Sequence, residues 1–526
     1  MGTWSKGVLA TFVLFSMGAA SAAAGPVRTE AGRVEGVRSG SLTVYKGIPF
    51  AAPPVGALRW RAPQPVAPWD GVRKADAFAP ICLQNGVSVP GAAPERMSED
   101  CLYLNVWTPA KRPNAKLPVM VWIYGGGWAN GSASTPLYWG DKLAQKGVVV
   151  VNISYRVGSF GFLAHLELTR ESESHSSGNY GLMDQIAALR WVRRNIAAFG
   201  GDPNNVTIFG QSAGSMSVSM LMASPLAKGL FHRAIGQSGG VFIPPEASPA
   251  ANTFFLAGAE QRGERLASLL GAKTLQDLRG VAADQLLQKQ GTSWHFILDG
   301  YVLPREPYDV FSEGRQHDVP LLLGSNADEG RMFLDGLTIR AASFTMDLQR
   351  QFGPLPAPLL VNYPASSDQQ ARTSRANLER DLRFGWDMWT WARLQARTGR
   401  GKVFYYHFAH TPPYPTDSPF ADWGAGHGME MRYVFGQLDQ EPWQWSPFDR
   451  KLSEMMAAYW TNFAKRGDPN GKGLPEWPAY SEGRENVLYL AAPVSVQGVA
   501  NRPALEVLDA IFSQARSARP KAATPP

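Results

Sequence analysis

The chain has 526 residues, of which 44% are hydrophobic, and 17 of them are tryptophan; this composition is typical of a globular protein with a well-filled core. Four of its cations, Lys6, Arg516, Arg519 and Lys521, lie at the two ends and leave only +3 of the formal net charge of +7 on the body. This charge is too small and too scattered for a surface that follows phosphates, which excludes a nucleic-acid-binding protein.

Residues 1–24 have the features of a secretory signal peptide. Lys6 supplies a positive start, the apolar stretch Val8–Ala20 follows, and Ala22 and Ala24 offer small residues for cleavage. The apolar stretch is shorter than the roughly 20 residues that a membrane helix needs, although an uncleaved anchor is the alternative interpretation. No other segment approaches that length, so we expect a secreted or periplasmic protein with no membrane span.

The body of the chain changes its pattern after about residue 100. Residues 27–50 alternate apolar residues with turns and predict a small β-meander, whereas the Pro- and Gly-rich residues 51–98 predict long surface loops. From Leu102 onwards strands and helices alternate, which predicts an α/β protein with a large, mostly parallel sheet flanked by helices. The expected strands are Leu117–Tyr124, Val148–Tyr155, Val206–Phe209, Leu321–Leu323 and Val403–Tyr406, with a helix at Leu182–Ala198.

Two segments interrupt this alternation with helical patterns and no strands. They lie near residues 255–300 and 340–400, and we expect them to form a helical cap over the carboxyl-terminal edge of the sheet, where α/β proteins bind ligands. A late amphipathic helix is predicted at Pro447–Lys465. The chain is therefore divided into a signal peptide (1–24), one folded domain (25–513) and a flexible tail rich in Ala, Pro and basic residues (514–526).

The most informative segment contains a strand, a sharp turn and a helix in direct succession. The strand Val206–Phe209 leads into Gly-Gln-Ser-Ala-Gly at Gly210–Gly214, and Ser215–Met222 is compatible with a helix. Such a turn holds its serine in a strained backbone conformation, and the flanking glycines let strand and helix pass close together. This arrangement is that of a nucleophile elbow and predicts Ser212 as a nucleophile.

A second Gly-x-Ser-x-Gly lies at Gly236–Gly240, with Ser238 at its centre. It follows a strand-like segment, but Pro244 and Pro245 oppose a helix behind it. Because an elbow needs that helix, we interpret Ser238 as a residue at the end of a strand near the site.

A serine nucleophile needs a histidine base and a carboxylate that orients the base, in the chain order serine, acid, histidine. His427 follows Ser212 and lies in a glycine-flanked loop that can present its ring at the edge of the sheet. The acid should end a strand, and Leu321–Leu323 leads to both Asp328 and Glu329. Spacing alone does not choose between these two carboxylates.

The reaction also needs backbone N–H groups that bind the oxyanion. Ala213 follows the nucleophile and supplies one donor, and the triplet Gly125–Gly127 at the end of a predicted strand supplies others. Glycine suits this role because it lets the backbone approach the reacting carbonyl.

The chain contains only two cysteines, Cys82 and Cys101. In an exported protein they can form a disulfide, and two buried free thiols are the alternative. Neither has a histidine or cysteine neighbour at the spacing of a zinc site, so we expect no metal centre here.

These features resemble the type-B carboxylesterase/lipase family. The resemblance extends from about residue 27 to residue 510 and implies an α/β-hydrolase fold and a serine esterase that needs no metal or organic cofactor, with residues 25–513 as its catalytic domain. It rests on the segment around Ser212 and on further blocks at Glu99–Pro109, Tyr45–Ala51, Asn179–Gln185 and Gly424–Gly436.

The resemblance implies a role for individual residues. It implies a triad with Ser212 as the nucleophile, Glu329 as the acid and His427 as the base. The other implied roles are oxyanion donors at Gly126, Gly127 and Ala213, polar neighbours of the triad at Ser238 and Glu430, and a disulfide between Cys82 and Cys101.

The departures from the family pattern concern the substrate. Cholinesterase-like members have Glu before the nucleophile, where this chain has Gln211, and they place a Trp in the first disulfide loop, where 83–100 has no aromatic residue. We therefore expect neutral or anionic esters rather than choline esters, because both features hold a cationic group. Trp128 stands where the family often has Phe and should narrow the pocket, and Arg331 and Arg432 could add positive potential.

The sequence thus predicts an exported serine carboxylesterase that hydrolyses a small-molecule ester through an acyl-enzyme. Family members in bacteria act on several classes of ester, and the tricarballylate side chains of fumonisin-type toxins are one candidate substrate. The alternatives are a lipase, which would need a long amphipathic lid, and a non-catalytic binding protein on the same fold, which would lack the serine or the histidine. The sequence leaves the oligomeric state open.

Overall fold

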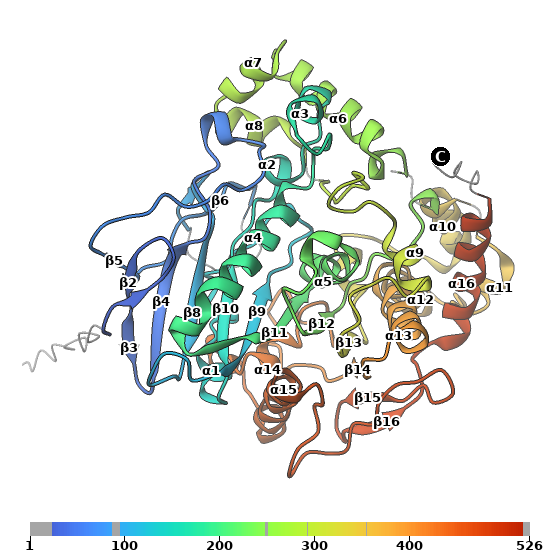
Figure 1. Cartoon of the computed structure of the whole chain (residues 1–526). Coiled ribbons are helices and arrows are strands. Elements are labelled where there is room, and N and C mark those ends of the chain that lie inside the picture. The colour runs from blue at the N-terminus through green and yellow to red at the C-terminus, as the bar shows by residue number, and fades with distance from the viewer. Residues whose placement is uncertain (1–23, 87–94, 248–250, 292, 354, 519–526) are drawn as a thin grey trace, which may run out of the picture.

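A computed structural model describes residues 24–86, 95–247, 251–291, 293–353 and 355–518 (Figure 1). The predicted signal peptide, apart from Ala24, and the end of the predicted tail lie outside these residues. Among the described residues, no helix combines the length and the apolar character that crossing a bilayer requires.

The centre of the molecule is a mixed sheet with eleven strands. Neighbouring strands from β10 to β15 are parallel, whereas β3, β4 and β8 at one end and β16 at the other pair antiparallel. This is the mostly parallel α/β sheet that the sequence predicts. The order is β16 (Ser495–Gln497), β15 (Val487–Leu490), β14 (Val403–Phe408), β13 (Leu321–Asn326), β12 (Arg233–Gln237), β11 (Gly201–Gln211), β9 (Leu117–Ile123), β10 (Val149–Ile153), β8 (Tyr103–Thr108), β4 (Leu42–Pro49) and β3 (Val37–Ser39).

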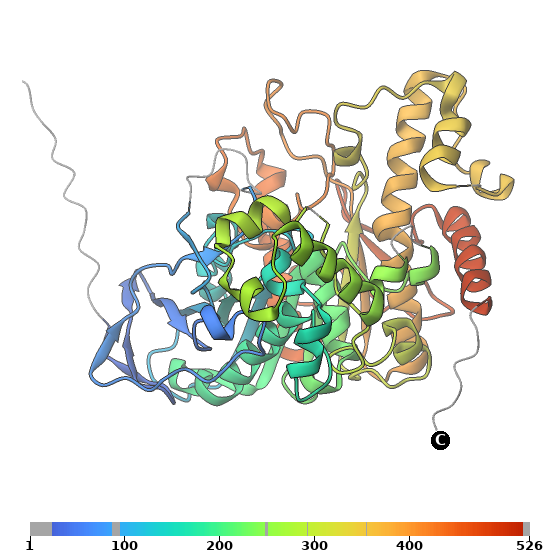
Figure 2. The same cartoon turned by 90° about the horizontal axis from the view of Figure 1, so that it is seen from above.

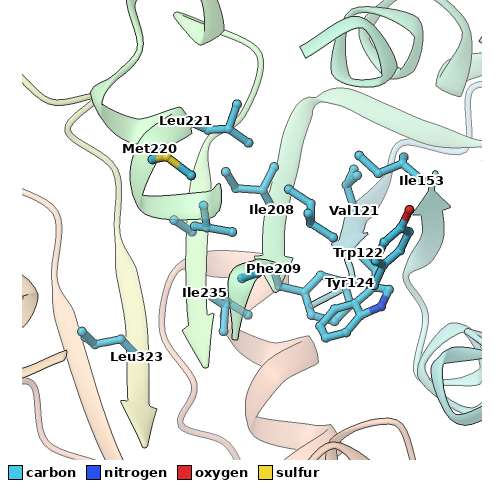
Figure 3. Packing of buried hydrophobic residues seen from close by; sticks show 14 of the residues in the cluster. Val121, Trp122, Tyr124, Ile153, Ile208, Phe209, Met220, Leu221, Ile235 and Leu323 are labelled. Carbon is cyan, nitrogen blue, oxygen red and sulfur yellow. The ribbon is translucent and has the colours of Figure 1, made fainter. Parts of the chain in front are cut away.

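The apolar runs of the central strands are buried because helices cover both faces of the sheet. Figure 3 shows Ile208 of β11 pointing toward Met220 and Leu221, while the ring of Phe209 points toward Trp122. Met220 and Leu221 belong to α5 (Ala213–Ala223), which covers one face of the sheet. On the other side the indole and phenyl rings lie 4.9 Å apart, and α15 (Pro447–Arg466) contacts the same two strands, β9 and β11.

The remaining helices follow the chain around this sheet (Figure 1). The predicted helix at 182–198 is α4 (Tyr180–Asn195), continued by one 3₁₀ turn at Ile196–Phe199. Short helices connect the other strands: α1 (Asp141–Gln145), α2 (Gly158–Phe162), α3 (Leu166–Glu171), α9 (Pro307–Ser312) and α14 (Met431–Val434).

The two segments predicted as a cap are helical. The first contains α6 (Leu256–Leu269), α7 (Leu275–Gly280) and α8 (Ala283–Lys289). It lies at the top of the molecule in Figure 1 and toward the viewer in Figure 2, which is seen from above. The second contains α10 (Phe344–Phe352), α11 (Ala357–Leu360), α12 (Asp368–Arg380), a π-helical turn, η9 (Asp381–Gly385), and α13 (Trp386–Thr398).

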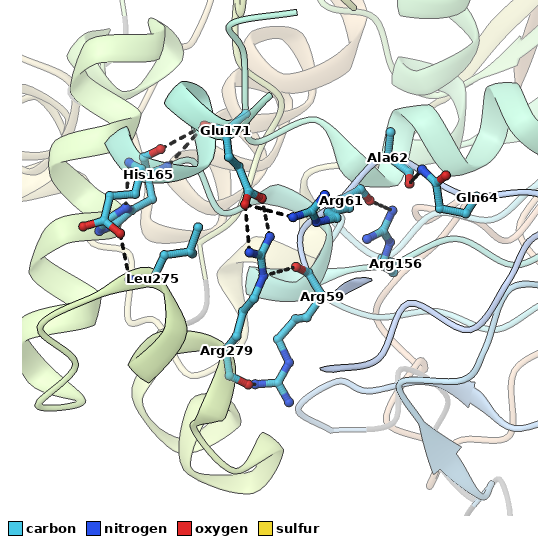
Figure 4. A network of polar contacts seen from close by, with 11 residues as sticks. Arg59, Arg61, Ala62, Gln64, Arg156, His165, Glu171, Leu275 and Arg279 are labelled. Carbon is cyan, nitrogen blue, oxygen red and sulfur yellow. Dashed lines mark hydrogen bonds and ion pairs between the residues drawn. The ribbon is translucent and has the colours of Figure 1, made fainter. Parts of the chain in front are cut away.

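A network of arginines fastens the first of these segments to the body (Figure 4). Arg279 of α7 pairs with Glu171 and donates from Nε to the carbonyl oxygen of Arg59 at 3.0 Å. In return Arg59 donates to the carbonyl oxygens of Arg279 and Val281 and pairs with Glu99. Reciprocal bonds of this kind hold the segment in one position.

The structure differs from the predictions in the segment 51–98 and at the carboxyl-terminal end of the domain. The segment 51–98, expected to be loops, contains the short strands β5 (Val72–Lys74), β6 (Ile81–Cys82) and β7 (Met97–Ser98), while β1 (Val27–Arg28) and β2 (Arg33–Glu35) pair in a separate small sheet with β5. Strands of two or three residues are too short to show a periodic pattern. The helix α16 (Arg502–Ser517) continues past residue 513, and its Arg516 guanidinium stacks 3.4 Å from the centre of the Tyr308 ring.

Candidate active site

The nucleophile predicted from the elbow lies at the sharp turn between β11 and α5. The backbone of Ser212 has φ 56° and ψ −127°, a conformation that residues other than glycine seldom adopt. A Cβ atom added to Gly214 would lie 2.0 Å from the carbonyl oxygen of Ile123, and one added to Gly210 would lie 2.4 Å from the backbone of Gly214. Only glycine therefore fits on either side of Ser212.

The predicted base and one of the two possible acids are in direct contact. Oε2 of Glu329 lies 2.5 Å from Nδ1 of His427, and the Glu329 carboxylate is fully buried. Its other oxygen, Oε1, accepts a hydrogen bond from the backbone N–H of Asn326 at 2.7 Å. Because a carboxylate accepts, the imidazole proton lies on Nδ1 and leaves Nε2 free to accept a proton.

Asp328 is turned away from the imidazole. Its carboxylate pairs with Arg331 at 2.8 Å and accepts the backbone N–H of Ala425 at 2.9 Å. Of the two neighbouring acids, the structure brings only Glu329 into contact with His427.

Two further side chains contact the imidazole of His427, and sequence reasoning foresaw neither contact. Nε2 of Gln211 lies 3.1 Å from Nε2 of His427, so the amide donates to the nitrogen that would accept the serine proton. The ring of Phe384 stacks on the imidazole with centroids 4.5 Å apart and planes 20° apart. Phe384 belongs to the π-helical turn η9, and no sequence pattern marks such a turn.

The predicted oxyanion donors line the same cavity as Ser212 and His427. Gly126 and Gly127 follow β9 with φ of 98° and 62°, and a Cβ on Gly126 would lie 2.2 Å from the carbonyl oxygen of Asn130. Ala213 is the first residue of α5, so its N–H has no acceptor within the helix. These three N–H groups can surround an oxyanion at the elbow.

The cavity has a volume of about 1090 Å³, enough for a ligand larger than a simple short-chain ester. Trp128 forms part of its wall, with its indole N–H 3.2 Å from Oγ of Ser217 and its ring edge-to-face with Phe296 at 5.8 Å. The other rings that line it are those of Tyr138, Phe254, Phe333, Phe352, Phe384, Phe420, Trp423 and Phe512.

A comparison with known proteins identifies the family. The model of the Carboxylesterase family matches residues 23–507. The chain belongs to the carboxylesterase family. The chain is a carboxylic ester hydrolase, because proteins similar to it over most of its length are esterases.

Similar proteins include enzymes from bacteria. Fumonisin B1 esterase of Sphingopyxis macrogoltabida is 39% identical over 500 residues, which are 90% of this chain and 88% of that protein. Para-nitrobenzyl esterase of Bacillus subtilis (strain 168) is 37% identical over 501 residues, covering 92% of this chain and 98% of that protein. A solved structure of PNB esterase superposes with a TM-score of 0.78 at 35% identity and covers 91% of this chain and 99% of its own. The predicted α/β-hydrolase fold is thereby confirmed.

Behind the imidazole, this carboxylesterase has a buried polar network. Glu430 accepts from Nε2 of Gln237 at 3.0 Å and from Nδ2 of Asn326 at 2.6 Å. Burial, with a contribution from the charge of Glu329, raises the pKa of Glu430 to about 7. Since the backbone of Asn326 holds Glu329 and its side chain holds Glu430, this residue links the two carboxylates.

Ser238 lies on the neighbouring strand end and does not line the cavity. It shares the positive φ of 56° with Ser212, donates its backbone N–H to the carbonyl oxygen of Gly324 at 2.8 Å, and is fully buried. Its hydroxyl has no hydrogen-bond partner among the described residues. The structure thus separates the two Gly-x-Ser-x-Gly serines, and only Ser212 faces the cavity.

The two arginines named from the sequence are both occupied. Arg331 pairs with Asp328, donates to the carbonyl oxygen of Asp422 at 2.9 Å and does not line the cavity. Arg432 lines it, but pairs with Glu441 at 2.7 Å and lies over the ring of Trp443 at 4.9 Å.

The two cysteines are bonded to each other. Cys82 ends β6 and Cys101 lies just before β8, with a sequence separation of 19 residues, and both are buried. Just after Cys82, the side chain of Gln84 bonds both ways with the backbone of Gly131: its Nε2 donates to the carbonyl oxygen and its Oε1 accepts the N–H.

Proposed function

We propose that the chain hydrolyses carboxylic esters through Ser212, His427 and Glu329. The observation that supports this proposal most directly is the 2.5 Å contact between Glu329 and His427 at the same cavity that Ser212 lines from a strained turn. A buried carboxylate at Nδ1 holds the ring and stabilises the imidazolium that forms during the reaction.

In the acylation step, Oγ of Ser212 attacks the carbonyl carbon of the ester while Nε2 of His427 takes its proton. The amide of Gln211 must release Nε2 at this point, because the same lone pair accepts both hydrogen bonds. The C–O bond to the alcohol then breaks, and His427 gives its proton to the leaving oxygen.

In the deacylation step, a water molecule repeats this sequence against the acyl-enzyme, and the acid is released with regeneration of the Ser212 hydroxyl. The negative oxygen of both tetrahedral intermediates would be bound by the N–H groups of Gly126, Gly127 and Ala213. Donors of this kind contribute about 3–4 kcal/mol each to the lowering of the barrier.

The substrate class that we infer is a neutral or anionic ester. Gln211 brings no negative charge to the nucleophile, and the similarity to fumonisin B1 esterase makes esters of the tricarballylate type a candidate. We also infer export, because the predicted signal peptide and the disulfide both belong to an oxidising compartment.

The test compares Ser212→Ala with Ser238→Ala on a p-nitrophenyl ester. Ser212→Ala should lower turnover by roughly 10⁶-fold, whereas Ser238→Ala should lose far less because its hydroxyl does not face the cavity. A fluorophosphonate probe should label the tryptic peptide that contains Ser212. Labelling of the Ser238 peptide, or a larger loss in Ser238→Ala, would overturn the assignment of the nucleophile.

A further inference from the structure

One cation in the active-site cavity has a guanidinium that is only partly used. Arg383 lines the cavity with Ser212 and His427, and 43% of its side chain is exposed. Its Nε donates to Oε2 of Glu379 at 2.7 Å, while no described residue accepts a hydrogen bond from its two terminal nitrogens. The terminal edge of the guanidinium is therefore open to a ligand.

Aromatic stacking holds Arg383 in this position. Its guanidinium carbon lies 4.2 Å from the centre of the Phe333 ring. Phe333 in turn stacks on Phe384 at 6.2 Å, and Phe384 stacks on His427 at 4.5 Å. Because Arg383 and Phe384 are consecutive in the π-helical turn η9, the backbone and the stack together fix the cation relative to the reacting centre.

The cluster of Arg375, Glu379 and Arg383 carries a net charge of +1. Glu379 is shared between Arg383 and Arg375, whose Nη2 lies 2.6 Å from Oε1, so one carboxylate faces two guanidinium groups. Two other acids line the cavity. Asp335 is exposed to solvent. Asp387 accepts hydrogen bonds from two backbone N–H groups, and burial raises its pKa to about 7.

We propose that Arg383 forms a carboxylate-binding subsite, and that the preferred substrates are esters that carry a free carboxylate group. A guanidinium offers a planar pair of N–H donors that matches a carboxylate with two parallel hydrogen bonds. The cavity is large enough, at about 1090 Å³, for the ester group to reach Ser212 while a free carboxylate of the same molecule reaches Arg383. This proposal rests on the proposed ester hydrolysis and names its substrate class.

The experiment compares two substrates of equal acyl length, p-nitrophenyl hexanoate and mono-p-nitrophenyl adipate, which differ by a terminal carboxylate. In Arg383→Gln the ratio of kcat/KM for adipate to that for hexanoate should fall at least tenfold, because a hydrogen-bonded charge pair is lost. Arg383→Lys should keep part of the ratio, since it keeps the charge without the planar fork. In the wild type the ratio should decrease with salt.

The matched control is Arg400→Gln, which removes the same charge from a side chain that is 98% exposed and lies outside the cavity. It should leave the ratio unchanged. Folding of Arg383→Gln is supported by Arg375, which still neutralises Glu379. An acyl chain ending in trimethylammonium completes the series, and wild type should hydrolyse it more slowly than the hexanoate.

The outcomes separate this proposal from the proposed function. Equal losses of kcat/KM on both esters in Arg383→Gln would leave the ratio unchanged and show that the residue acts on His427 through the Phe384 stack, whereas wild-type kcat/KM on both esters would show that it binds no carboxylate. Either result overturns the subsite. Failure of the wild type to hydrolyse even the hexanoate would instead contradict the proposed ester hydrolysis.

Discussion

The replacement of Glu329 by Gln tests how the base is oriented. The amide oxygen of a glutamine can still accept the Asn326 N–H, which now lies 2.7 Å from Oε1. Its NH₂ group would then replace the oxygen that lies 2.5 Å from Nδ1 of His427. A donor at this place forces the imidazole proton onto Nε2, so that the ring can no longer take the proton of Ser212.

The size of the effect follows from this change of tautomer. In serine hydrolases of known mechanism the same carboxylate-to-amide change lowers kcat by about 10⁴, which corresponds to about 5 kcal/mol of barrier. We expect Glu329→Gln to lower kcat by 10³- to 10⁴-fold, while KM changes by only a few-fold because Glu329 does not line the cavity.

Asp328→Asn provides the control, since it makes the same chemical change one residue away. It weakens an ion pair with Arg331 that is 44% exposed on the arginine side, and such pairs contribute at most about 1 kcal/mol to stability. Steady-state kinetics on one p-nitrophenyl ester should therefore show kcat/KM within about threefold of wild type. Equal losses in the two variants, or a Glu329→Gln enzyme with more than a tenth of wild-type kcat, would refute the reasoning.

Two predictions concern stability. Burial raises the pKa of Asp387 from 3.8 to about 7, so between these values the folded protein keeps a proton that the unfolded chain releases, and stability falls as the pH rises through this window. The free energy of unfolding of Asp387→Asn, measured with urea relative to wild type, should therefore increase by on the order of 2 kcal/mol from pH 5 to pH 8. If the difference between variant and wild type did not change with pH, this prediction would be wrong. Opening the Cys82–Cys101 bridge with a reductant should lower the free energy of unfolding by about 2–5 kcal/mol, and peptide mapping that finds both thiols free beforehand would contradict the pairing.

The features predictable from the sequence are those that local physical chemistry dictates. The central strands contain apolar runs because both faces of the sheet are covered. The turn at Ser212 needs glycines because β11 and α5 pass within contact distance. Such requirements act on consecutive residues, so they are visible as patterns. The family resemblance then implies Glu329 as the acid, and in the structure this carboxylate contacts His427.

The features that the sequence could not reveal depend on the direction of side chains. Arg331, Arg383 and Arg432 all follow or precede site residues closely, yet their partners differ, and only Arg383 keeps an open edge toward the cavity. The stacking of Phe384 on the base depends on one π-helical turn inside a long helical segment. A helical periodicity of 3.6 residues places such a side chain incorrectly.

The neutral amide at Gln211 connects the departure seen in the sequence with the charges of the cavity. An amide can donate to Nε2 of neutral His427, as it does here, and after rotation its oxygen can accept from the imidazolium, so it suits both protonation states of the base. A carboxylate in its place could only accept, and it would put a negative charge beside the nucleophile. With Gln211 uncharged, the electrostatic field near His427 depends on buried Glu329 and Glu430 and on the partly open Arg383. An acidic substrate therefore meets no negative charge on the residue next to Ser212.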